Sequence, residues 1–120
     1  MRRLTFLAAA AMLVSTAAFA DPPTLSIGQQ ATLDGTGVVV NVVANCGDSA
    51  SDAVVVVMVR QGDDTGEGLL PFSSTGNRKT LSVQVTGIYA PGAAAATAEL
   101  SCAGMPEGLV EGATIMISAP

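Results

Sequence analysis

The stretch Leu33–Cys46 reads LDGTGVVVNVVANC and decides the fold class. Its first residues, Asp34-Gly35-Thr36-Gly37, are typical of a turn, and the valine-rich run that follows is typical of a β-strand. If Cys46 points inward, the two-residue period of a strand assigns each residue to a face. The inward set is Val38, Val40, Val42 and Ala44, and the outward set is Val39, Asn41, Val43 and Asn45. The run is too short to span a membrane, so we expect a strand that brings a cysteine to a buried core.

Similar runs recur along the chain with Gly, Asp, Asn and Ser between them, which favours an all-β sandwich or barrel. The expected strands are Leu25–Ile27 continued by Ala31–Leu33, then Val38–Cys46, Ala53–Gln61, Lys79–Thr86, Ala93–Cys102 and Val110–Ser118. The segment Gly62–Asn77 contains four glycines and is expected to be a long connection. Within it, Leu69–Phe72 is expected to form a short edge strand or a plug over the core.

The first twenty residues, MRRLTFLAAAAMLVSTAAFA, have the pattern of a signal peptide. Arg2 and Arg3 precede a short apolar run, and Ala18-Phe19-Ala20 fits the small-x-small cleavage rule. We therefore predict a signal peptide over residues 1–20 and a single domain over residues 21–120. After cleavage no integral membrane segment is expected, and the chain is predicted to be secreted or periplasmic.

The chain has two cysteines, Cys46 and Cys102, and no histidine. In an exported protein these two cysteines are expected to form one disulfide. The chain-entropy model gives such a long loop a stabilisation of about 4 kcal/mol. Without histidine there is no Ser-His-Asp triad, no Cys-His pair and no imidazole zinc site, so we expect no enzyme and no cofactor.

Cysteines on an early strand and on the penultimate strand, with a valine-rich strand after the first, resemble the immunoglobulin-like sandwich. The alternation Ala98-x-Leu100-x-Cys102 is similar to the approach to the second cysteine in that fold. The chain has no tryptophan, and Leu100 stands where antibody domains carry tyrosine, so the likeness is to bacterial secreted domains. The resemblance implies an antiparallel β-sandwich of about seven strands with an inter-sheet disulfide.

A narrower resemblance is to the neocarzinostatin-type chromophore-binding apoproteins. It lies in the small, acidic, Ala/Gly/Val/Thr-rich composition and in Asp-Gly-Thr before a valine strand. Those proteins are similar sandwiches that bind an apolar ligand in a cleft. This resemblance implies a carrier of small apolar ligands. It is an alternative to a binding or structural module.

The acidic loop after Ala53–Gln61 is the one candidate metal site in the sequence. Asp63, Asp64 and Glu67 could begin a calcium site, although the loop lacks the regular oxygen ligands and distal glutamate of an EF-hand. A solvated acidic turn is the simpler interpretation. No metal is therefore expected.

The strand Ala53–Gln61 carries a second apolar stripe. Val55, Val57 and Val59 are expected to face inward, which leaves Val54, Val56 and Met58 on the outer face. This stripe reflects either strand propensity or a contact face for another protein.

The charge of the chain restricts its partners. Without Arg2 and Arg3, three basic residues oppose ten acidic ones, a net charge of −7. Such a chain repels nucleic acid. The leading hypothesis is a non-catalytic binding or structural module that acts through a sheet face or edge on another protein. A small-ligand carrier and a fimbrial or adhesion subunit are the alternatives.

Overall fold

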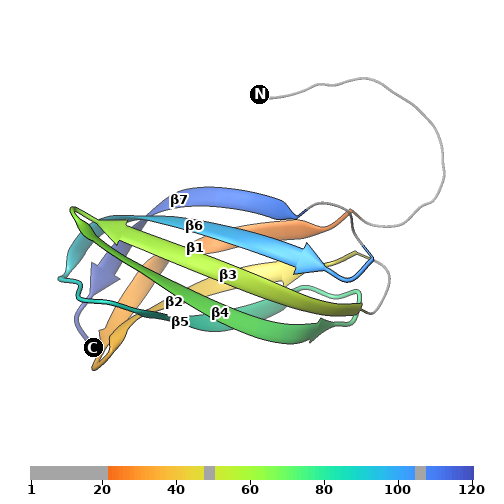
Figure 1. The fold of residues 1–120 in the computed structure, drawn as a ribbon, viewed down its shortest axis with the longest axis horizontal. Coiled ribbons are helices and arrows are strands. Elements are labelled where there is room, and N and C mark those ends of the chain that lie inside the picture. The colour runs from red at the N-terminus through yellow and green to blue at the C-terminus, as the bar shows by residue number, and fades with distance from the viewer. Residues whose placement is uncertain (1–21, 48–50, 105–107) are drawn as a thin grey trace, which may run out of the picture.

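The computed structural model describes residues 22–47, 51–104 and 108–120 (Figure 1). The predicted signal peptide lies outside the described residues. The described part contains no helix and seven strands. They are β1 (Thr24–Asp34), β2 (Gly37–Asn45), β3 (Ser51–Gln61), β4 (Asp64–Ser74), β5 (Lys79–Thr86), β6 (Gly92–Cys102) and β7 (Leu109–Ser118). The all-β class and the seven strands are confirmed.

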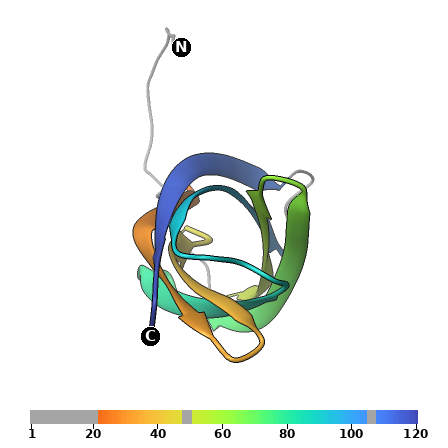
Figure 2. The ribbon, with the colours of Figure 1, turned by 90° about the vertical axis from the view of Figure 1, so that its left-hand side faces the viewer.

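The seven strands form one sheet in the order β4-β3-β6-β7-β1-β2-β5. All neighbours are antiparallel except β1 and β7, which pair in parallel over Gln30–Thr32 and Met116–Ser118. The sheet rolls up until its two outer strands lie beside each other, so the molecule is nearly barrel-like (Figure 2). The expectation of two separate sheets is not confirmed, because β1 joins the two halves through hydrogen bonds on both of its sides.

The core lies inside the rolled sheet and follows the two-residue period. On β2, Val38, Val40, Val42 and Ala44 are fully buried, as predicted. On β3 the predicted inward residues Val55, Val57 and Val59 are also buried. On β6 the alternate residues that lead to Cys102 are buried as well; they are Ala94, Ala96, Ala98 and Leu100. Asn45 was expected at the surface, but it is buried. There its amide donates to the carbonyl oxygen of Gly76 and its Oδ1 accepts from the amide of Gly47, which compensates the buried polar group.

The turn between β1 and β2 is held by one carboxylate. Asp34 Oδ1 accepts hydrogen bonds from the amides of Thr36 and Gly37, each at 2.9 Å, and from the side-chain amide of Gln84 at 2.9 Å. These donors lower the pKa of Asp34, the Thr36 amide most of all, because they favour the charged form. The Asp-Gly-Thr-Gly turn predicted from the sequence is therefore present, and it is tied to β5.

The expectation of a long connection over Gly62–Asn77 is wrong. A two-residue turn at Gly62-Asp63 leads directly into β4, which pairs with β3 along its whole length of eleven residues. Gly66 and Gly68 occupy inward positions on β4, where a Cβ would overlap the carbonyl oxygens of Thr86 and Gln84 on β5. Glycine is required here for the close approach of two backbones. The glycines that suggested a loop instead close the rolled sheet.

The other half of β4 supports part of the prediction for Leu69–Phe72. Leu70 and Phe72 are half-buried and pack against the core, as a plug would. They belong to a full-length strand rather than to a short one. Larger inward side chains therefore replace the glycines along the second half of β4.

Candidate functional site

The predicted outer stripe of β3 lies on the outside of the rolled sheet. Val54 and Val56 are half-buried, and the side chain of Met58 is 53% exposed. Their inward neighbours on β3 are fully buried. The strand is therefore apolar on both faces, and only the inner face is covered by the core.

The neighbouring strand β4 extends this apolar surface. Pro71 pairs with Val54 and Leu69 pairs with Val56, and both β4 residues face outward. Leu69 is 62% exposed. We call the five residues Val54, Val56, Met58, Leu69 and Pro71 the contact face. Cross-strand pairs of this kind bring side chains within contact distance, so the five form one continuous apolar surface.

Leu69 and Pro71 are not assigned to this face from the sequence, because Leu69–Phe72 is expected there to be a short edge strand or a plug within a long connection. A signal was present in the alternation of the segment Thr65–Ser73. Outward Thr65, Glu67, Leu69, Pro71 and Ser73 alternate with inward Gly66, Gly68, Leu70 and Phe72. The glycines at inward positions hid this period.

Charged side chains border the contact face. Glu67 on β4 pairs with Met58, and Glu99 on β6 pairs with Val56, so one carboxylate lies on each side of β3. Asp52 and Arg60 stand at the two ends of the outward row of β3, and both are exposed. The border thus holds three carboxylates and one guanidinium.

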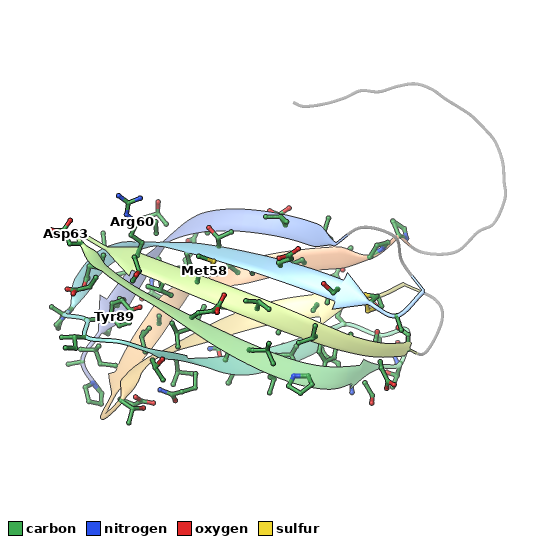
Figure 3. All side chains as sticks on the ribbon, in the orientation of Figure 1. Met58, Arg60, Asp63 and Tyr89 are labelled. Carbon is green, nitrogen blue, oxygen red and sulfur yellow. A yellow bond between two sulfur atoms is a disulfide. The ribbon has the colours of Figure 1, made fainter. Side chains whose placement is uncertain are left out.

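A hollow of ≈ 550 Å³ lies at the Arg60 end of the contact face. Its lining residues are Met58, Val59, Arg60, Gly62, Asp63, Thr65, Ala95 and Thr97. Figure 3 shows Arg60 and Asp63 projecting from the sheet near the β3–β4 turn, with Met58 further along β3. The depression arises because β6 contributes only the small side chains of Ala95 and Thr97 beside the longer Met58 and Arg60. It lies outside the sheet and is separate from the core.

The end of β3 beneath the hollow is held by the β5–β6 connection. The hydroxyl of Tyr89 donates to the carbonyl oxygen of Val59 at 3.1 Å. Gln61 donates from its side-chain amide to the carbonyl oxygen of Ala90 at 2.9 Å and accepts from the Ala90 amide at 2.8 Å. These bonds fix the position of the β3–β4 turn relative to β6. The sequence offered no signal for this role of Tyr89.

Tyr89 lies at the end of the rolled sheet that carries the β3–β4 turn (Figure 3). Partial burial raises its pKa, and the nearby negative charge of Asp64 raises it further. Gly66 and Gly87 leave the space that the ring occupies, since a Cβ at either position would come within contact of it. Because its pKa is raised, the phenol of Tyr89 keeps its proton and donates the hydrogen bond to Val59.

The calcium candidates Asp63, Asp64 and Glu67 do not converge. Asp63 lies in the turn, whereas Asp64 and Glu67 lie on β4 three residues apart and so point to opposite faces. Across residues 22–47, 51–104 and 108–120, no group of three or more His, Cys, Asp or Glu side chains is close enough to hold a metal ion. The geometry gives the calcium interpretation no support.

The disulfide lies at the other end of the molecule. Cys46, just after β2, is bonded to Cys102 at the end of β6, as predicted. Cys102 is buried and Cys46 is half-buried against the core. The bond links two strands that are not neighbours in the sheet, so it ties the rolled sheet across its interior.

No helix in the described residues is long and apolar enough to cross a membrane. No protein-family model matches the sequence, and no curated protein is significantly similar to it.

Proposed function

We propose that this chain is a secreted, non-catalytic binding module of immunoglobulin-like architecture, and that it binds another protein through the contact face. The observation that carries the proposal is the set of five outward apolar side chains in register on two adjacent strands. Monomeric soluble proteins seldom leave a contiguous apolar surface of this kind uncovered. Met58 and Leu69 contribute most, since more than half of each side chain is exposed.

The strand order supports an immunoglobulin-like assignment. β1, β2 and β5 are neighbours, as are β4, β3, β6 and β7. In an immunoglobulin-like domain the first, second and fifth strands form one half, and the third, sixth and seventh the other. The fourth strand departs from the constant-type arrangement, in which it is hydrogen-bonded to the fifth, because β4 pairs with β3 here. The disulfide between the end of β2 and the end of β6 corresponds to the bond between the second and sixth strands of that fold.

Binding through a face is favoured over binding through the edge of β4. Pro71 has no N–H to offer an added strand. Along the other half of this edge, Gly66 and Gly68 are in close contact with β5. Both features protect β4 from pairing with another chain. The outward side chains of β3 and β4 have no such protection.

The chemistry of the chain supports a non-catalytic role in an oxidising compartment. The sequence has no histidine, and its two cysteines are joined. A disulfide is compatible with an exported protein, and the first twenty residues carry the signal-peptide pattern. These features support the assignment as a secreted or periplasmic protein.

The test compares Val56→Lys with Val39→Lys. Both residues are half-buried, outward valines inside a strand, but Val39 lies on β2, away from the contact face. Immobilised wild type and Val39→Lys should retain the same partner from the host's secreted or periplasmic extract, and Val56→Lys should lose it. Each substitution should cost about 1 kcal/mol or less of folding stability. Retention of the same partner by folded Val56→Lys would contradict the proposal.

A carrier of small apolar ligands is the second candidate, and the hollow beside Met58 favours it. Its volume, ≈ 550 Å³, suits a small ligand. Ala95→Trp would fill the hollow while leaving Val54, Val56 and Leu69 unchanged. If the protein is a carrier, this variant should lose binding of an apolar fluorescent dye; if it binds a protein through the contact face, Val56→Lys should have the larger effect on that partner.

A further inference from the structure

We propose that the partner presents an apolar centre with lysine or arginine on two opposite sides. The contact face would then recognise the partner by charge as well as by apolar contact. This inference rests on the proposed function and specifies the chemistry of the partner. It follows from the arrangement of charges around the contact face. Glu67 and Glu99 flank the apolar centre, one from β4 and one from β6.

The register places these two carboxylates diagonally across β3. Glu67 is opposite Met58, whereas Glu99 is opposite Val56, two residues away. With neighbouring strands about 4.8 Å apart and a rise of about 3.3 Å per residue, their Cα atoms are separated by roughly 12 Å. Two cationic groups at this spacing would meet both carboxylates while an apolar side chain between them contacts Val56 and Met58.

The same spacing suits an extended segment. Residues i and i+4 of a β-strand lie on one face and are about 13 Å apart. The pattern basic-x-apolar-x-basic would therefore place its central side chain on the contact face and its two cations near Glu67 and Glu99. An acidic pattern of the same shape would be repelled by both carboxylates.

A second copy of this chain is the poorer occupant. It would bring the same three border carboxylates, with only Arg60 to compensate them. The whole chain carries ten acidic residues against five basic ones, so two copies repel each other. Charge complementarity at the border therefore favours a different molecule with basic residues around its apolar centre.

The experiment selects peptides from a displayed library of random short sequences. The oxidised protein is the target at low salt, and Val56→Lys is used to remove peptides that bind elsewhere. The recovered peptides should carry lysine or arginine on both sides of a large apolar residue. Their affinity for the Glu67→Gln/Glu99→Gln variant should be about three- to tenfold lower than for the wild type. Added salt should weaken binding to the wild type more than to this variant.

A matched control is Glu111→Gln, which removes a carboxylate from β7. Glu111 is exposed. It pairs with Ala98, whose side chain is on the inward face, so Glu111 does not share the outward face that carries Glu99 and the contact face. Binding of the selected peptides should be unchanged in this variant. A tenfold loss there would mean that overall charge, rather than the flanking pair, attracts the peptides, and would overturn the inference.

The remaining outcomes separate the inference from the proposed function. One outcome is that the selected peptides depend on Val56 and yet bind the Glu67→Gln/Glu99→Gln variant with the same affinity as the wild type. That result would overturn the inference and leave the proposed function standing. Self-association of the wild type that is lost in Val56→Lys would also overturn it, because the occupant would then be a second copy. Failure to recover any peptide that depends on Val56 would count against both.

Discussion

Substitution of Gly68 by alanine tests how the rolled sheet closes. Gly68 lies on β4, and a Cβ at this position would overlap the carbonyl oxygen of Gln84 and lie 2.9 Å from its carbonyl carbon. The obstacle is backbone on a neighbouring strand, so no side chain can rotate to make room. The variant can fold only if β4 moves away from β5, which disturbs the packing of both strands.

The magnitude follows from two opposing effects. Insertion of a methyl group into a tightly packed site costs about 1–3 kcal/mol, and the backbone overlap puts Gly68→Ala at the upper end, about 3 kcal/mol. Alanine in place of glycine inside a strand raises the free energy of unfolding by about 0.5–1 kcal/mol, because alanine loses less conformational freedom on folding. We therefore expect Gly68→Ala to lower the free energy of unfolding by about 2 kcal/mol.

Gly112→Ala is the matched control. Gly112 also lies inside a strand, β7, but a Cβ there would meet only the carbonyl oxygen of Ala96 at 3.8 Å, an ordinary contact. This variant should be more stable than the wild type by about 0.5–1 kcal/mol. The assay is urea unfolding of the oxidised protein, followed by far-ultraviolet circular dichroism. If Gly68→Ala is stabilised as much as Gly112→Ala, then β4 and β5 are not in close contact in solution and the account of closure is wrong.

Three further predictions concern the core, the disulfide and the β1–β2 turn. Val57→Asp should lower the free energy of unfolding by about 4 kcal/mol or more, because Val57 is fully buried. Thr86→Asp at the surface should change it by about 0.5 kcal/mol or less, and equal urea midpoints would contradict the strand register. Intact mass after alkylation without reductant should show no added label, and replacing both cysteines by serine should cost about 4 kcal/mol. The pKa of Asp34 is lower in the folded protein than its ordinary value of 3.8, so its contribution is present above that pH and is lost as the pH falls through the folded value. Asp34→Asn should lack this acid-dependent loss of stability, and identical acid unfolding curves would contradict it.

The alternation of apolar residues predicts which side chains are buried on most strands. Successive valines of β2 and β3 point to opposite faces of the sheet. This two-residue period is a local property of a strand, so it can be predicted without knowledge of distant contacts. The two cysteines left only one pairing within the chain, and the structure confirms it. Asn45 departs from the pattern because its partners, Gly76 and Gly47, lie in loops whose position the strand period does not predict.

The role of the segment after β3 follows from contacts between strands and not from its local sequence. Glycine is typical of turns when a sequence is read locally, so Gly66 and Gly68 indicated a loop. Glycine is needed at these two positions because of β5, whose contacting residues Thr86 and Gln84 lie 20 and 16 residues further along the chain. These residues approach β4 only when the sheet rolls up. The same holds for the contact face. Val54, Val56 and Met58 were visible as a stripe, but Leu69, Pro71 and the flanking Glu67 and Glu99 join them only through strand pairing, which depends on contacts between residues distant in sequence.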